Sequence, residues 1–249
     1  MNIDTFIKQG EHGICQDYVL TNNDPENPEL VLSDGCSSSP NTEVGSKLIV
    51  LNKLIGNHIF ENYNEYRSIL GDYFCDATLL YLETFGDWIS IRIYGDGFVL
   101  CKFKNGKIIL YNHEYSSNAP YYLSYGLDDD RRLLYMYNFK GSKYITNKYT
   151  FKESLVTVEK NEYGNVHIPT YCYLKDEIET IIIGSDGMNS FKTGNDILPL
   201  QDICVKMLDF KNYNGSFLKR RMNKLIKELN VEGYTNFDDV SLAALTTKE

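Results

Sequence analysis

The sequence has few histidines and no closely paired cysteines, the residues that usually hold zinc. Only 4 histidines occur among 249 residues, and they are scattered along the chain. None of the 6 cysteines forms a CxxC pair, which argues against zinc ribbons and thioredoxin-like redox sites. We therefore expect free thiols, as is usual in a reducing compartment, most of them small buried hydrophobic residues.

Long apolar runs and basic clusters are also missing. The most apolar stretches, residues 48–55 and 178–184, are too short or too interrupted to span a bilayer, which takes about 20 residues. The first residues, MNIDTFIKQGEHG, lack the basic start and apolar stretch of a signal peptide. The net charge is −9, and no basic run indicates a nucleic-acid partner. We expect a cytoplasmic protein that binds neither membranes nor nucleic acid.

The remaining composition is that of a globular protein. Hydrophobic residues make up 43% and charged residues 24%, which excludes disordered and fibrous classes. No repeat and no linker rich in glycine, serine or proline divides the chain, so residues 1–249 are expected to form a single domain.

Strands predominate among the predicted elements. Alternating or continuous apolar runs predict strands over residues 15–21, 29–34, 77–85, 88–96, 98–103, 107–112, 131–139, 149–158, 178–184 and 240–245. Helical spacing of apolar residues predicts helices over 43–62, 195–209 and 215–230. Asn105-Gly106 is a strong hairpin signal, which favours an antiparallel meander over 77–112. Mostly antiparallel strands with separate helices predict an α+β fold.

Three strongly apolar strands end in the dipeptide Asp-Gly. They are VLSDG, ending at Gly35, IYGDG, ending at Gly97, and IIIGSDG, ending at Gly187. Asp17 and Asp238 precede or enter two further strands. One Asp-Gly usually marks a turn, but three copies at the ends of buried strands favour convergence. Crowded carboxylates repel one another unless cations neutralise them, and hard oxygen ligands select Mg²⁺ or Mn²⁺.

The ordered set of motifs resembles the type 2C metal-dependent serine/threonine protein phosphatases. The motifs are HGICQD (12–17), DGCSS (34–38), TEVGS (42–46), AT (77–78), GDG (95–97), GSDGM (184–188) and DDVSLAAL (238–245). They are most similar to a bacterial branch with H-x-x-x-C-Q-D followed by D-G-x-G-S. The resemblance runs from Gly10 to Leu245. It implies a four-layer αββα sandwich of two mainly antiparallel sheets flanked by helices, with a variable flap at about 113–147.

This resemblance implies a centre of two Mg²⁺ or Mn²⁺ ions and a third, weaker one. Asp34 would bridge two metals, Asp17 would contact a metal through water, and Asp96 would belong to the third site. The implied metal ligands are Asp17, Asp34, Gly35, Asp96, Asp186 and Asp238. Water activated between the two metals would attack phosphorus in line with the departing serine or threonine oxygen. Asp34, Asp186 and Asp238 are thus the implied catalytic residues, and Thr78 would support them.

Several positions depart from the family's pattern. His12 stands where many members have an arginine that holds the substrate phosphate. A protonated histidine can make that contact, and a structural role for His12 is equally open. Arg131 or Arg132 in the flap could replace the missing arginine, although their charge run is more simply a solvated turn. Cys36 lacks the CxxxxxR loop of a cysteine phosphatase, because residues 36–42 read CSSSPNT.

The expected function is therefore metal-dependent hydrolysis of phosphoserine or phosphothreonine, with a phosphoprotein as the partner. Two alternatives stay open. A phosphatase-like binding or regulatory module with little turnover is favoured by the missing arginine and disfavoured by the intact Asp34, Asp186 and Asp238. A phosphatase of a small phosphorylated metabolite would use the same metals. The oligomeric state does not follow from the sequence.

Overall fold

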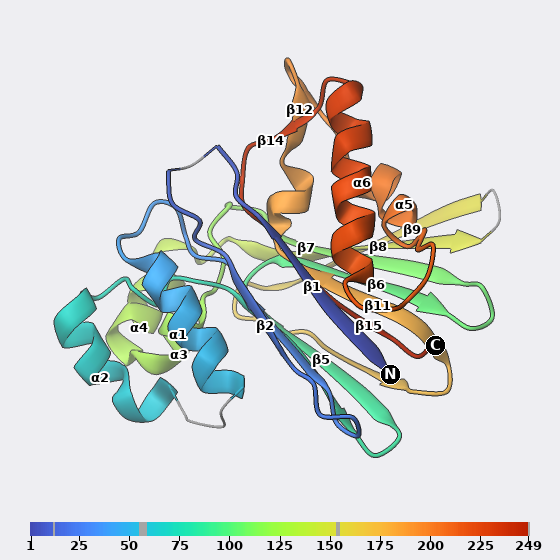
Figure 1. Ribbon diagram of the computed structural model, residues 1–249. Helices are drawn as coiled ribbons and strands as arrows, with labels where there is room; N and C mark the ends of the chain where they lie inside the picture. Colours follow the sequence, from blue (N-terminus) through green and yellow to red (C-terminus); the bar gives the residue numbers. More distant parts are fainter. Residues whose placement is uncertain (12, 55–58, 153–154, 249) are drawn as a thin grey trace.

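Two antiparallel sheets form the centre of the computed structural model, which describes residues 1–11, 13–54, 59–152 and 155–248 (Figure 1). The larger sheet has the strand order β1-β15-β11-β6-β7-β8-β9, and the smaller one β10-β5-β4-β3-β2. The larger sheet comprises β1 (Asn2–Lys8), β6 (Gly97–Phe103), β7 (Ile108–Tyr115), β8 (Lys143–Lys152), β9 (Leu155–Gly164), β11 (Ile178–Gly184) and β15 (Val240–Thr246). The smaller comprises β2 (Tyr18–Asn22), β3 (Glu29–Ser33), β4 (Leu79–Phe85), β5 (Trp88–Tyr94) and β10 (Thr170–Leu174).

Helices cover the outer face of each sheet. The helices are α1 (Thr42–Leu54), α2 (Ile59–Leu70), α3 (Leu123–Leu127), α4 (Asp129–Asn138), α5 (Leu200–Met207) and α6 (Phe217–Val231). Helix α1 packs on the smaller sheet, and α5 and α6 pack on the larger sheet (Figure 1). A short 3₁₀ turn (Asp186–Asn189) follows β11, and β12 (Phe191–Thr193), β13 (Asp196–Ile197) and β14 (Thr235–Asn236) form a small third sheet. In the described residues, no helix has the length and apolarity needed to cross a bilayer.

The alternation of side chains in β15 builds two cores at once. Leu242 and Ala244 belong to the core under α5 and α6, whereas Ala243 and Leu245 belong to the core between the two sheets. Every residue of β15 is buried, because both of its faces are covered. The sequence VSLAAL is for that reason apolar at every position except Ser241. The helix–sheet–sheet–helix order confirms the predicted α+β class and the αββα sandwich.

The predicted strand over residues 131–139 is wrong, because residues 131–138 lie in α4 and Phe139 is its C-cap. The Asp128 side chain accepts a hydrogen bond from Arg131 N at 3.1 Å and so caps the helix. Asp129 and Asp130 follow in the first turn, where negative charge is favourable. The adjacent apolar residues of RRLLYMYN favour a strand, but the capping signal at Asp128 outweighs that pattern.

Other boundaries move for equally local reasons. The helix predicted over 195–209 begins only at Leu200, directly after Pro199. Asp196 and Ile197, which the prediction placed in that helix, form β13. The predicted helix over 43–62 is two helices, α1 and α2, and residues 55–58 between them lie outside the described residues. The predicted strand over 149–158 covers parts of β8 and β9, and residues 153–154 are likewise outside the description.

A buried histidine on β7 makes stability depend on pH. His113 is 1% exposed; its Nδ1 lies 3.2 Å from Thr146 Oγ1, and its Nε2 lies 3.2 Å from the Tyr171 hydroxyl. Its ring stacks on Tyr144 with 5.6 Å between centroids. Burial lowers the pKa of His113 to about 3. Below about pH 6.5 the unfolded chain therefore takes up a proton here that the folded chain excludes.

We expect the free energy of unfolding to fall as the pH drops from 6.5 towards 3, by up to about 1.4 kcal/mol per pH unit from this residue. His113→Gln, which does not titrate, should show a smaller slope. Urea denaturation at a series of pH values measures both slopes. At pH 7.5 the histidine is neutral in both states, so the difference in free energy of unfolding between the two proteins there gives the packing cost of the substitution. Equal slopes for the two proteins would contradict the assignment.

Candidate active site

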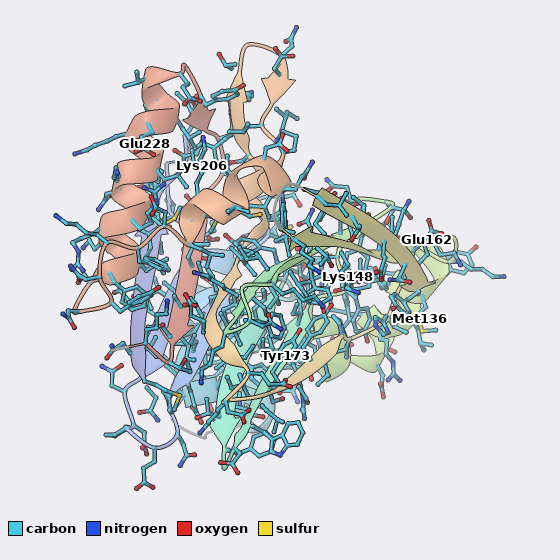
Figure 2. The ribbon with its side chains drawn as sticks, turned by 90° about the vertical axis from the view of Figure 1, so that its right-hand side faces the viewer. Met136, Lys148, Glu162, Tyr173, Lys206 and Glu228 are labelled. Carbon is cyan, nitrogen blue, oxygen red and sulfur yellow. The ribbon has the colours of Figure 1, made fainter. Side chains whose placement is uncertain are left out.

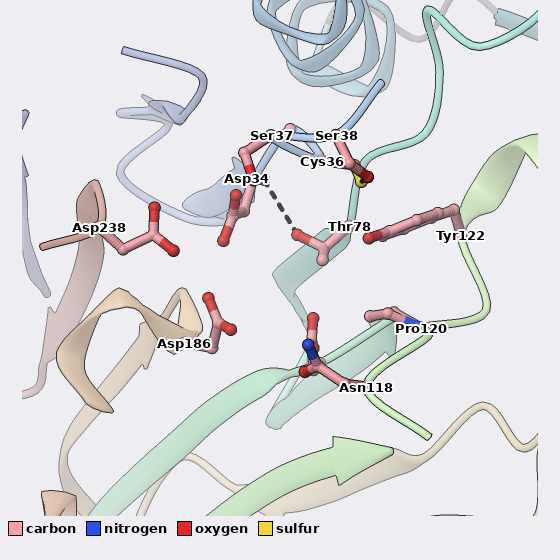
Figure 3. A pocket seen from close by; sticks show the side chains of 12 residues that line it. Asp34, Cys36, Ser37, Ser38, Thr78, Asn118, Pro120, Tyr122, Asp186 and Asp238 are labelled. Atoms are coloured by element: carbon pink, nitrogen blue, oxygen red, sulfur yellow. Dashed lines mark hydrogen bonds between the residues drawn. The ribbon is translucent and has the colours of Figure 1, made fainter. Parts of the chain in front are cut away.

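Four of the predicted acidic residues line one pocket at the ends of the two sheets. The cavity measures about 280 Å³ and is lined by Asp34, Gly35, Cys36, Ser37, Ser38, Thr78, Asp96, Asn118, Pro120, Tyr122, Asp186 and Asp238. Figure 3 shows the carboxylates of Asp34, Asp186 and Asp238 pointing towards one another across the pocket. They come from separate places in the chain: the end of β3, the turn after β11 and the segment before β15.

Reciprocal bonds to Thr78 fix the backbone of Asp34 (Figure 3). Asp34 N donates to Thr78 Oγ1 at 3.0 Å, and Thr78 N donates to Asp34 O at 2.8 Å. The next pair of residues, Gly35 and Ala77, forms an isolated bridge. These bonds extend the pairing of β3 with β4 as far as the pocket, so Asp34 is held at a fixed position without using its carboxylate.

Two of the glycines in the Asp-Gly motifs are required by close backbone contacts. A Cβ on Gly187 would lie 1.8 Å from Asp239 O, and one on Gly35 would lie 2.9 Å from Thr42 O and 3.0 Å from Gln16 O. Only a residue without a side chain allows these approaches. The glycines thus bring the acidic loops into contact.

Asp17 lies behind the pocket wall and is 2% exposed. Its Oδ2 accepts a hydrogen bond from Ser185 Oγ at 2.9 Å, whereas its buried Oδ1 has no hydrogen-bond partner among the described residues. Burial raises the pKa of Asp17 to about 7. A buried carboxylate oxygen without a partner is costly, and a cation or a cation's water would satisfy it.

The pocket carboxylates oppose one another's ionisation. Burial, followed by the charges of Asp17 and Asp186, raises the pKa of Asp34 well above its usual range. Burial and the charge of Asp186 do the same to the pKa of Asp96. The pKa of Asp186 is also raised, by burial and by Asp238. A divalent cation would remove this repulsion, and the oxygen-rich lining suits Mg²⁺ or Mn²⁺.

No three acidic, histidine or cysteine side chains of the described ranges are close enough to hold an ion by themselves. Water molecules and backbone oxygens, such as that of Gly35, would therefore complete any coordination sphere. Mg²⁺ usually keeps several of its waters, so the open arrangement fits this ion.

Asp239, next to the pocket residue Asp238, holds two chain segments together. It is 2% exposed; its Oδ1 accepts from Gly10 N at 2.7 Å, and its Oδ2 accepts from Gln16 N at 2.6 Å. It thus attaches the Asp17 segment to β15. Sequence reasoning missed this role. The signal was the pair Asp238-Asp239 itself, because neighbouring side chains in an extended chain point in opposite directions.

The wall opposite the carboxylates comes from the segment between β7 and α3, which the sequence did not assign. It supplies Asn118, Pro120 and Tyr122, and the Tyr122 ring points into the pocket towards Thr78 (Figure 3). Burial raises the pKa of Cys36, but hydrogen bonds with Ser38 and Tyr122 outweigh it and leave the pKa below its usual value. No lysine or arginine belongs to the described lining, and His12 lies outside the described residues.

Arg131 and Arg132 do not line the pocket. Arg131 Nη2 donates to the two carboxylate oxygens of Asp76 at 2.7 and 2.9 Å, and its guanidinium lies over the rings of Tyr73 and Tyr125, at 4.9 and 5.0 Å from their centroids. Arg132 pairs with the exposed Asp129 at 2.8 Å. Arg131 thus acts inside the protein, where it ties α4 to the segment before β4.

Asp76 links Arg131 to the loop that lines the pocket. Its carboxylate accepts from Ser39 Oγ at 3.1 Å and from Ser124 Oγ at 2.7 Å, and its backbone oxygen accepts from Cys36 N at 2.8 Å. The buried pair of Arg131 and Asp76 therefore joins α3 and α4 to the loop that follows Asp34.

Comparison with known proteins gives matches among solved structures only. No family model and no curated protein matches the sequence. A bacterial serine phosphatase superposes with a TM-score of 0.61 at 14% identity, covering 100% of this chain and 98% of that one. Serine/threonine phosphatase Stp1 from Staphylococcus aureus gives 0.60 at 13%, covering 100% and 96%. A serine/threonine phosphatase of S. agalactiae gives 0.51 at 15%, covering 97% of each chain.

The chain has the fold of bacterial serine/threonine phosphatases. At these identities the likeness concerns the fold, and it spans nearly the full length of both chains in each comparison. A structure described as serine-threonine phosphatase 2C from Toxoplasma gondii also matches, with a TM-score of 0.51 at 9% identity, covering 98% of this chain and 94% of that one.

Arg131→Gln should destabilise the protein by about 3–5 kcal/mol, because it leaves the buried Asp76 without its cation. The pair is well shielded, with side chains 11% and 5% exposed. Arg132→Gln is the matched control on the same helix and should change stability by no more than about 0.5 kcal/mol. Urea unfolding monitored by circular dichroism measures both. Similar small effects for the two variants would show that the Arg131 pair does not anchor α4.

Proposed function

We propose that this protein is a metal-dependent phosphatase that hydrolyses phosphoserine and phosphothreonine in proteins. The main support is the convergence of Asp34, Asp96, Asp186 and Asp238 in one pocket. The shared fold with solved serine/threonine phosphatases adds to it.

The residues that would hold two Mg²⁺ or Mn²⁺ ions are Asp34, Asp186, Asp238 and the Gly35 carbonyl. Asp17 would act through water, and Asp96 would serve a third, weaker ion. When bound, the two ions supply a hydroxide nucleophile near neutral pH and neutralise charge on the phosphoryl oxygens. The orphaned oxygen of Asp17 and the mutual repulsion of the pocket carboxylates support this assignment.

The chain's own residues would position the substrate. The lining hydroxyls and amide of Ser37, Ser38, Asn118 and Tyr122 can donate hydrogen bonds to phosphoryl oxygens. Thr78 would keep Asp34 in place through its backbone bonds. Neutral donors bind phosphate less strongly than an arginine fork does, so we assign the cationic contact to His12, which stands in the sequence where the family's arginine does.

One alternative has a specific observation in its favour. A pocket with no arginine or lysine in its described lining suits a phosphatase-like binding module with little turnover. A phosphatase of small phosphorylated metabolites would use the same carboxylates. Comparing hydrolysis of a phosphoserine peptide with that of sugar and nucleoside monophosphates, at equal enzyme concentration, separates the protein substrate from the metabolite.

The protein should hydrolyse an aryl phosphate in the presence of Mn²⁺ or Mg²⁺, and this hydrolysis should cease when a chelator is added. Asp34→Asn and Asp186→Asn should each lower kcat by more than about 100-fold, since loss of even an outer-shell partner of a metal typically costs about 10–100-fold. Colorimetric assay with each metal measures this. No turnover with any metal, together with retained binding of a phosphopeptide, would establish the binding module instead.

Cys36→Ser should keep kcat within about threefold of the parent protein, because the proposed nucleophile is water and not the thiolate. The same aryl phosphate assay measures it, and Asp34→Asn at the preceding strand end provides the inactive reference. Abolished turnover in Cys36→Ser with a normal fold would point to a thiol nucleophile.

A further inference from the structure

A second cavity, of about 410 Å³, lies along the first two turns of α6. It shares no lining residue with the acidic pocket. Its lining is formed by Asp209, Lys211, Asn212, Phe217, Arg220, Arg221 and Lys224. Figure 2 shows the neighbourhood, with Lys206 on α5 and Glu228 on α6 labelled.

The lining of this cavity is strongly cationic. It has four basic side chains and a single carboxylate, that of Asp209, within a chain whose net charge is −9. Glu228, one turn beyond Lys224, lies 3.7 Å from that lysine and offsets part of the charge. The remaining positive charges repel one another, and a bound anion would relieve this repulsion.

Arg221 is the buried member of the group, at 6% exposure. Its Nε donates to the Lys206 carbonyl oxygen at 2.6 Å, and its Nη2 lies 3.4 Å from Glu228 Oε2. Its Nη1 makes no hydrogen bond with the described residues, and the side chain lines the cavity. A guanidinium has five N–H donors, so a nearly buried one with free donors is a preformed contact for an anion.

Arg220 is held in place by the loop that forms the other wall. Its Nη2 donates to Asn212 Oδ1 and to Asn214 O, both at 2.7 Å. These bonds use one of its three nitrogens and fix the orientation of the fork. Phe217, which is 1% exposed, forms the apolar base and belongs to the core under α6. Water is thus limited on one side, which strengthens the electrostatic attraction of the arginines.

We propose that this cavity binds a small anion that carries two phosphate groups. Guanidinium forks match the geometry of phosphate oxygens. Each phosphate monoester carries about −1.5 to −2 charges at pH 7, so two of them more than balance the excess of cations. The volume is within the range of about 300–1,000 Å³ of small-molecule sites. The proposal does not depend on the phosphatase activity.

Inorganic pyrophosphate should bind the full chain at one site in metal-free buffer, as measured by isothermal titration calorimetry. The double variant Lys211→Gln/Lys224→Gln should raise the Kd for pyrophosphate by about tenfold or more, and Arg220→Gln should do the same. Both changes affect exposed side chains, so the fold should persist. Lys227→Gln, an exposed lysine on α6 outside the lining, is the matched control and should leave Kd within about twofold.

Four results would overturn the proposal. They are the absence of binding, equal weakening by Lys227→Gln and by the double variant, loss of binding in Asp34→Asn, and citrate binding as tightly as pyrophosphate. The second would indicate unspecific surface charge, and the third would place the anion in the acidic pocket. The fourth would show a site for anions in general. Asp34→Asn with unchanged Kd and no phosphatase activity would support two separate sites.

Discussion

The crowding of half-buried carboxylates at the ends of the two sheets is the constraint on which the site depends. Asp34 follows a strand of the smaller sheet, whereas Asp186 and Asp238 flank strands of the larger one. The repulsion between these carboxylates would drive the sheets apart if the strand ends were free to move. They are not free, because side chains of β3, β11 and β15 pack in one core between the sheets, and β11 pairs with β15 from Thr180 to Gly184. Apolar packing thus holds an arrangement that electrostatics opposes.

Neutral hydroxyl groups position the acidic residues of the site. Thr78 bonds to the backbone of Asp34, and Ser185 donates to Asp17, so each acid is positioned while the charge that a cation would need is left in place. Asp239 is the exception, since both of its oxygens accept backbone N–H groups. Two adjacent aspartates therefore have different roles: Asp239 joins two chain segments, and Asp238 lines the pocket.

The sequence predicts the sheets and the acidic strand ends well, because both depend on local patterns. Apolar strands closed by Asp-Gly need only a few neighbouring residues to be recognised. The wall formed by Tyr122 depends on contacts with residues far away in the chain, such as Cys36, and no local pattern reveals these. Arg131 shows the same limit: its partner Asp76 is 55 positions away. The misassigned α4 had a readable local signal, the cap at Asp128.

The distribution of cations gives the two cavities different requirements. The acidic pocket has no lysine or arginine in its described lining, so a phosphate dianion that enters it meets carboxylates of the same sign. Neutral donors alone bind a dianion weakly, so added divalent charge would have to supply most of the affinity for phosphate. The cavity along α6 has the opposite sign and needs no metal to attract the same chemical group. Under both proposals, removing metal should therefore abolish phosphate binding in the acidic pocket and leave it intact in the cavity along α6, where the chain supplies its own cations.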